Sequence, residues 1–298
     1  MGNKTNKKNQ SGLSNYFQEL NVNAPLFDEL EKDPAWWRIL REDKDLYINV
    51  RKDNYINVYY RGASVMKLSY SKGKFKSAIH NYYLGVDKDI AEEVGYEYGP
   101  KNLSPLEIVS KIKTIKHRVE SNKKNKADIK DEDCGGADYS EKYVQGKMYL
   151  TGSYLDTEFA LSLDSGTPIR MDLVKVDSCG NIQFEELKLV GDIRLTNGKI
   201  EKQMSNYNKF LEGIDKKSVV DYYNRVLVIM RKIKILPDRI SCDKINGVND
   251  DVRLVVTKYK KKGKTNDRWN RLNKIKCLCD ANNIKSNIDE VLADYESI

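Results

Sequence analysis

The fold of this chain is decided by residues 169–190, IRMDLVKVDSCGNIQFEELKLV. Two apolar runs rich in β-branched residues, 169–176 and 182–190, flank the turn-forming residues 177–181, Asp-Ser-Cys-Gly-Asn. This pattern is typical of two antiparallel strands joined by a tight loop. The stretch therefore predicts a β-hairpin, and the length of its loop decides which charged residues face each other.

A five-residue loop at 177–181 places Asp172 opposite Glu186. Cross-strand partners have Cβ atoms about 5 Å apart, and Lys188, two residues beyond Glu186, lies on the same face of the strand. One face of the hairpin would then carry two carboxylates and an ammonium group. A four-residue loop stays open as an alternative; it would place Glu186 opposite Leu173 and separate the charged groups.

Two carboxylates this close repel each other, so a stable fold needs something that offsets the repulsion. At about 5 Å they repel by roughly 3 kcal/mol at an effective dielectric constant near 20. A shared proton, a nearby cation such as Lys188 or a divalent metal ion relieves the repulsion. A hard divalent ion held by carboxylates, with a lysine near its bound water, suits phosphodiester hydrolysis. The alternative is an amphipathic hairpin with a solvated charged face and a cross-strand ion pair.

Asp172 followed by Glu186-Leu187-Lys188 resembles the motif of the PD-(D/E)xK nuclease superfamily. Of the four Asp/Glu-x-Lys matches in the chain, only this one lies inside an apolar strand with an aspartate on the partner strand. The resemblance covers about residues 138–260. One departure is Met171, which stands where the superfamily often has a proline.

Two flanking segments extend the resemblance. Gln203 and Tyr207 in QMSNY resemble the Gln-x3-Tyr helix of the superfamily's recombination-exonuclease branch, and Glu141 stands where the first core helix carries a glutamate. The resemblance implies that Gln203 holds Lys188 or the substrate phosphate and that Tyr207 contacts substrate. Plain helix packing is the alternative for both residues.

The resemblance also implies a metal cofactor, Mg²⁺ or Mn²⁺. Lys188 would orient or help deprotonate the attacking water, and Glu158 competes with Glu141 for the last place among the ligands. Glu185 points to the opposite face by strand periodicity and should be dispensable. The implied ligands are Asp172, Glu186, the carbonyl oxygen of Leu187, and Glu141.

Composition narrows the function classes. The chain has 298 residues, 40% of them hydrophobic, and no apolar run approaches the 18 or more residues of a membrane span. We therefore expect no membrane partner. Its five cysteines are odd in number and irregularly spaced, so we expect no disulfide framework and a cytoplasmic location. With only two histidines, His80 and His117, carboxylate–lysine chemistry is favoured over histidine-based catalysis.

The net charge of +8 is concentrated in two clusters. Residues 111–130 hold eight lysines or arginines against two acidic residues, and residues 253–276 hold ten against one. Such clusters favour binding to a phosphate backbone, although solvated helix faces or loops are the alternative. We expect nucleic acid as the partner, and DNA in preference to RNA. The residues predicted to bind it, besides Tyr207, are Lys258, Lys260, Lys261, Lys262, Lys264 and Arg268.

The predicted fold class is α/β (α+β), with a mixed sheet flanked by helices in a restriction-endonuclease-like core and a smaller antiparallel meander before it. The meander spans residues 46–84, and its tyrosines could stack on bases, but we interpret them as sheet packing. Helices and strands in the core are expected in the order α-β-β-β-α and then α-β. The predicted parts are a basic tail (1–12), a helix-plus-meander module (13–105), a basic helix and linker (106–137) and the core (138–298).

Two hypotheses from other classes stay open. One is a catalytically inactive nucleic-acid-binding module on the same fold. The other is a regulatory protein whose meander binds a protein partner. The sequence does not decide between a protein partner and a homo-oligomer.

Overall fold

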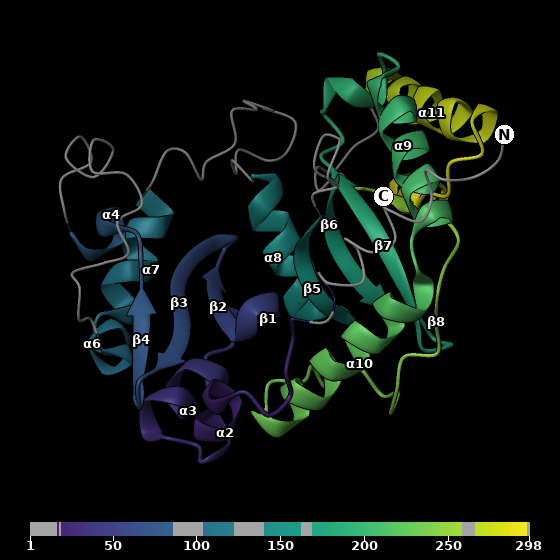
Figure 1. Cartoon of the computed structure of the whole chain (residues 1–298). Coiled ribbons are helices and arrows are strands. Elements are labelled where there is room, and N and C mark those ends of the chain that lie inside the picture. The colour runs from purple at the N-terminus through teal and green to yellow at the C-terminus, as the bar shows by residue number, and fades with distance from the viewer. Residues whose placement is uncertain are drawn as a thin grey trace, which may run out of the picture.

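The computed structural model describes residues 17, 19–85, 104–121, 140–161, 169–257 and 266–296. These residues form two β-sheets with helices around and between them (Figure 1), so the α+β class is confirmed. One continuous hydrophobic core runs through both sheets. No helix among the described residues is long and apolar enough to cross a membrane.

The first sheet is the predicted four-stranded antiparallel meander. Tight turns with residues at positive φ, among them Gly62 and Gly73, join its strands. The prediction that strand structure continues to residue 84 is wrong: after the last strand, the His80 ring accepts a hydrogen bond of 3.2 Å from the Tyr82 backbone and caps a short helix, α4. The elements are β1 (Leu46–Arg51), β2 (Tyr55–Tyr60), β3 (Ala63–Ser71), β4 (Lys74–Ala78) and α4 (Asn81–Leu84).

Short helices cover the meander. Ser104 and Glu107 form a capping box at the start of α6, and the basic helix expected from residue 106 onward is interrupted at Lys111. In Figure 1, α6 and α7 lie beside β4, and α2 and α3 lie at one end of the sheet. The helices are α2 (Pro25–Glu31), α3 (Ala35–Glu42), α6 (Pro105–Ser110) and α7 (Ile112–Ser121).

The second sheet contains the predicted hairpin at its centre. Its first three strands are antiparallel, and two short strands then pair in parallel with the far edge of β7. The expectation that the strand near residue 253 joins the core sheet is confirmed. The strands are β5 (Tyr154–Leu161), β6 (Ile169–Val176), β7 (Asn181–Lys188), β8 (Gly247–Val248) and β9 (Arg253–Val256).

Helices surround the second sheet in the expected order. The helix α8 contacts strands of both sheets and lies between them in Figure 1, and α10 packs under both through an apolar face. The helices are α8 (Glu141–Thr151), α9 (Lys199–Gly213), α10 (Lys216–Lys232), α11 (Asn266–Ala281) and α12 (Ile288–Glu296), with a short 3-10 helix, η4 (Ile193–Leu195).

Polar bonds join the two sheets where β1 meets β5. Asn49 donates a hydrogen bond of 2.6 Å to the Thr157 hydroxyl, and Arg51 contacts Asp156 at 2.5 Å. All four side chains are buried or nearly so. This junction fixes the meander against the edge of the second sheet.

The tyrosines beside this junction pack against each other. Tyr47 stacks on Tyr59 with ring centroids 4.9 Å apart, and Tyr149 lies at the same distance from Tyr47. All three are buried, so the interpretation as packing is confirmed for Tyr47 and Tyr59 of the meander. The cysteines among the described residues are free thiols, as expected.

Candidate functional site

The hairpin has the register of the five-residue loop. The loop occupies residues 177–181, where the Asp177 carboxylate accepts hydrogen bonds from the backbone of Cys179 and Asn181, both at 2.9 Å. Gly180 has φ of +79°, which suits glycine. Val176 then pairs with Ile182, and the pairing runs on to Leu173 opposite Glu185. Continued by one residue, this register puts Asp172 opposite Glu186.

Lys188 is the centre of the charged group. Its side chain is only 2% exposed. Its ammonium nitrogen Nζ contacts a carboxylate oxygen of Glu186 and donates a hydrogen bond of 2.7 Å to the Leu187 carbonyl. It lies 3.8 Å from Asp172 Oδ2 and 3.9 Å from Glu141 Oε2. Because lysine is almost never fully buried unless it is paired, these four groups define its environment.

Asp172 is held from two sides. Its carboxylate accepts a hydrogen bond of 2.8 Å from the Leu187 backbone, across the hairpin. Its own carbonyl accepts a bond of 2.5 Å from Gln145 of α8. Gln145 is four residues after Glu141 in α8 and was not among the residues predicted for the site. In the structure it ties α8 to β6 and so fixes Glu141 near the other carboxylates.

The three carboxylates outnumber the lysine, and their protonation reflects this. Burial, together with the charge of Asp172, raises the pKa of Glu186 to about 7, although Lys188 acts in the opposite direction. Burial also raises the pKa of Asp172 and of Glu141 above their ordinary values, again opposed by Lys188. In this cluster (Glu141, Asp172, Glu186, Lys188; hereafter the carboxylate–lysine cluster) three carboxylates share one lysine, and burial makes their charged forms less favourable.

The helix α9 supplies Gln203. Its side-chain amide donates hydrogen bonds of 2.6 Å to Glu186 Oε1 and 2.8 Å to the Tyr207 hydroxyl. Gln203 thus holds the carboxylate beside Lys188, whereas the sequence led us to expect contact with Lys188 or phosphate. Tyr207 is buried, and its hydroxyl donates a 2.5 Å bond to the carbonyl of Arg170. The structure places Tyr207 as a support for Gln203 and not on an exposed surface where substrate would reach it.

The two other glutamates considered for the site lie elsewhere. Glu158 is on β5 at φ of +55°, and its exposed carboxylate pairs with Lys142 at 3.3 Å. Of the two competitors, Glu141 is therefore the one within 4 Å of Lys188. Glu185 points to the opposite face, as predicted, where it is buried and accepts a hydrogen bond of 2.9 Å from the Tyr154 hydroxyl.

A pair of residues that the sequence did not single out lies beside the cluster. Asp192 and Arg194 follow directly after β7 and form a close ion pair. Arg194 Nη2 is 3.9 Å from Glu141 Oε2. The available signal was an Asp-x-Arg pair immediately after the strand that carries the Glu-x-Lys motif.

The structure describes only part of the predicted basic surface. Lys258, Lys260, Lys261, Lys262 and Lys264 lie outside the described residues, as does the side chain of Arg268, so their role stays a prediction. In the other basic cluster, Lys116 pairs with Asp43 and Asp45 at 2.7 and 2.9 Å, and Arg118 bonds the carbonyl of Tyr82. These two cations hold α7 against the meander.

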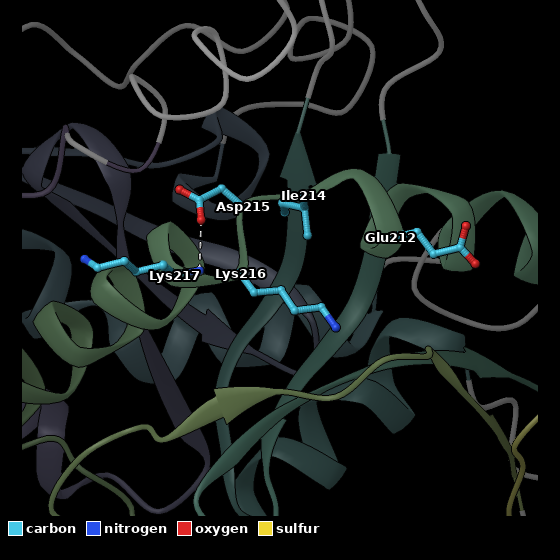
Figure 2. Close-up of a pocket in the computed structure, with 5 residues that line it drawn as sticks. All are labelled: Glu212, Ile214, Asp215, Lys216 and Lys217. Atoms are coloured by element: carbon cyan, nitrogen blue, oxygen red, sulfur yellow. Dashed lines mark hydrogen bonds between the residues drawn. The ribbon is translucent and has the colours of Figure 1, made fainter. Parts of the chain in front are cut away.

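A surface hollow between α9 and α10 lies apart from the carboxylate–lysine cluster. Figure 2 shows its lining. Nine residues of helix separate Glu212 from Gln203, a rise of about 13 Å. Lys216 pairs with Asp250, Lys217 pairs with Asp221, and Asp215 caps α10, so the charged groups here stabilise the helix junction. The lining residues are Glu212, Ile214, Asp215, Lys216 and Lys217.

The carboxylate–lysine cluster has the donor atoms of a metal site without being a closed one. Among the residues that the structure describes, no three histidine, cysteine, aspartate or glutamate side chains are grouped as a metal site. The oxygens around Lys188 are instead the carboxylates of Asp172 and Glu186 and the Leu187 carbonyl, with Glu141 farther out. Mg²⁺ prefers oxygen ligands and commonly keeps water and substrate oxygens beside one or two carboxylates. The oxygens here are of the chemical kind that Mg²⁺ or Mn²⁺ takes, and in this structure Lys188 binds those of Glu186 and Leu187.

Compared with protein-family models, with curated proteins and with solved structures, the chain has no match in any of the three.

Proposed function

We propose that this protein is a metal-dependent nuclease of the PD-(D/E)xK type, which hydrolyses phosphodiester bonds in nucleic acid, with DNA as the favoured substrate. One observation carries the proposal: Asp172, Glu186 and Lys188 gather on one face of a hairpin. Glu141 and Gln203 approach that group from two different helices. Five polar groups from four elements converge here, which a solvated ion pair does not require.

The chain's own residues would divide the work. Asp172, Glu186 and the Leu187 carbonyl would hold the metal ion, and Glu141 would complete the ligands directly or through water. When bound, Mg²⁺ or Mn²⁺ supplies charge stabilisation and a more acidic water. Lys188, held by Glu186 and the Leu187 carbonyl, would orient the attacking water and stabilise negative charge on the phosphate. Gln203 keeps Glu186 in place for both tasks.

The surplus of carboxylates is the physical argument against a purely structural role. A buried charge that loses its partner is costly, and here burial raises the pKa of all three carboxylates, with repulsion from Asp172 adding to the rise at Glu141 and Glu186. The number of carboxylates, three for one lysine, exceeds what a structural ion pair needs. A divalent cation would relieve the repulsion.

The test is cleavage by the purified full chain. Supercoiled plasmid, linear duplex, single-stranded DNA and RNA are each incubated with Mg²⁺, with Mn²⁺ and with a chelator. We expect cleavage that requires metal and is lost in Asp172→Asn. Asp221→Asn is the matched control, because Asp221 is an exposed aspartate on α10 that pairs only with Lys217 among the described residues.

The outcomes separate the hypotheses. If no substrate is cut with either metal, or if Asp172→Asn cuts like the wild type, the proposal fails. Salt-sensitive binding without cleavage would favour an inactive nucleic-acid-binding module. The products also define the reaction: nicked or linearised plasmid indicates internal cutting, whereas digestion of linear substrates alone indicates cutting from an end.

A further inference from the structure

The turn after β7 is held in place by a helix from the far end of the chain. Arg271 of α11 donates hydrogen bonds of 2.8 Å to the Val190 carbonyl and 2.9 Å to the Asp192 carbonyl. Asp192 also bonds back to the Leu189 carbonyl through its own N–H at 2.8 Å. A loop fixed at both carbonyls has few conformations left, so any side chain that it presents is already positioned.

That turn presents the guanidinium group of Arg194. Asp192 binds it on one edge, through Nε at 2.9 and 3.0 Å and through Nη2 in closer contact. The same Nη2 faces Glu141 at 3.9 Å. Nη1 has no acceptor among the residues that the structure describes. The side chain is 41% exposed, compared with 2% for Lys188.

The arrangement exceeds what a local cap needs. Asp192 caps η4 by accepting a hydrogen bond of 2.8 Å from the Arg194 backbone N–H, and any residue other than proline would provide that N–H at position 194. The guanidinium group adds nothing to the cap. The Arg194 side chain is instead partly exposed, as are the side chains of Glu141, which it faces, and Asp172.

We propose that Arg194 binds a non-bridging oxygen of the phosphate that is cleaved. The inference rests on the proposed nuclease function. In hydrolysis a water oxygen bonds to phosphorus, the bond to one ester oxygen breaks, the water loses a proton to solvent, and the departing oxygen gains one. Arg194 takes no part in these bond changes. Its planar fork matches phosphate geometry, and a donor fixed in advance stabilises developing charge without reorganising.

Asp192 serves Arg194 as a positioning residue. The carboxylate holds the Nε edge of the guanidinium group. Burial acts to raise the pKa of Asp192, but hydrogen bonds from the Arg194 side chain and backbone lower it below its ordinary value. With Asp192 ionised, the arginine keeps its orientation while its Nη1 edge meets the substrate. A lysine at position 194 would keep the charge and lose the fork.

The experiment uses steady-state cleavage kinetics with Arg194→Ala, Arg194→Gln and Arg194→Lys. The matched control is Arg231→Ala, because Arg231 is similarly exposed at 38% and bonds the carbonyls of Cys242 and Asp243 away from the cluster. We expect kcat to fall about 10²-fold in the alanine and glutamine variants, with KM little changed and thermal unfolding close to the wild type. The lysine variant should be intermediate.

Chemical rescue gives a readout that a structural role would not move. Added guanidinium ion, kept below denaturing concentration, should restore part of the activity of Arg194→Ala and none of that of Lys188→Met. If the wild type cuts and the Arg194 variants cut within threefold of it, or if only KM changes, this inference is overturned while the nuclease function stands. If the wild type cuts nothing, both fall.

Discussion

Two buried groups of charges in this protein look alike at first and differ in how their charges balance. At the junction of the sheets, Arg51 meets Asp156 at 2.5 Å and also bonds the Thr157 carbonyl and the Tyr59 hydroxyl, both at 2.8 Å. Asp156 in turn accepts a bond of 2.7 Å from the Thr157 backbone. One carboxylate faces one guanidinium group, and both also bond to neighbouring protein groups.

The carboxylate–lysine cluster is built from the same kinds of group but is not balanced. Three carboxylates surround Lys188, and two of them, Asp172 and Glu141, keep side chains that are 27% and 33% exposed. A raised pKa does not separate the two regions, because burial raises the pKa of Asp156 to about 6 against the attraction of Arg51. What separates the two regions is that the cluster has more carboxylates than cations and that two of these carboxylates are partly exposed to solvent. The comparison teaches that the balance of carboxylates and cations, rather than burial, distinguishes the two regions.

The largest effect should follow from Lys188→Met. Methionine keeps most of the volume of the side chain, so we expect the fold to survive while cleavage falls by about 10³-fold or more. Nucleic-acid binding should persist. Divalent-metal affinity, measured by calorimetric titration of Mn²⁺ into the protein alone, should rise because the positive charge nearest Asp172 and Glu186 is gone.

The control for that variant is Lys175→Met on the same hairpin. Lys175 pairs with Gln183 and lies on the opposite face, over the ring of Tyr154. Its substitution should change neither cleavage nor Mn²⁺ affinity. Wild-type cleavage by Lys188→Met, or equal effects of the two substitutions, would show that the wrong face of the hairpin has been chosen.

A smaller effect, and on stability alone, is expected from Arg51→Met. Removing one partner of a buried pair leaves an uncompensated charge, which typically costs about 3–5 kcal/mol. The free energy of unfolding from urea denaturation should fall by that amount, while the folded fraction still cuts. The double variant Arg51→Met with Asp156→Leu should recover most of the loss, since apolar replacements of a balanced pair are often neutral. A loss of cleavage without a loss of stability would place the junction in the site.

The smallest effect should come from Glu185→Gln. Burial raises the pKa of Glu185, opposed first by Lys175, and its carboxylate accepts one hydrogen bond from Tyr154. Glutamine can accept the same bond without a charge, so stability should change by less than about 1 kcal/mol and cleavage should be unchanged. Thermal unfolding measures the change in stability, and the plasmid assay measures cleavage. A large loss of cleavage would mean that this carboxylate acts in the chemistry.

Local pattern carried the sequence predictions furthest. The five-residue loop, the pairing of Val176 with Ile182 and the opposite orientation of Glu185 all follow from strand periodicity and turn chemistry, which involve only neighbouring residues. The four-stranded meander was predictable for the same reason. Its last segment was not, because His80 gives the chain a helix cap that strand propensity does not reveal.

Contacts between distant segments were beyond the sequence alone. The spacing of Gln203 and Tyr207 put them on one helix face, but whether they would meet Lys188, substrate or the core depended on how α9 packs on the sheet. In the structure they bind Glu186 and the Arg170 carbonyl. Gln145 and Arg271 likewise act through carbonyls far away in the chain, and a carbonyl oxygen has no signature in the sequence.

The sequence by itself determined the hairpin and, for a five-residue loop, the presence of two carboxylates and a lysine on one of its faces, because strand geometry repeats every two residues. Only the tertiary structure decided between the two loop lengths, buried Lys188, brought Glu141 and not Glu158 to it, and placed Arg194 beside them. Those outcomes depend on how helices from separate parts of the chain pack against one sheet, and packing is a property of the whole core.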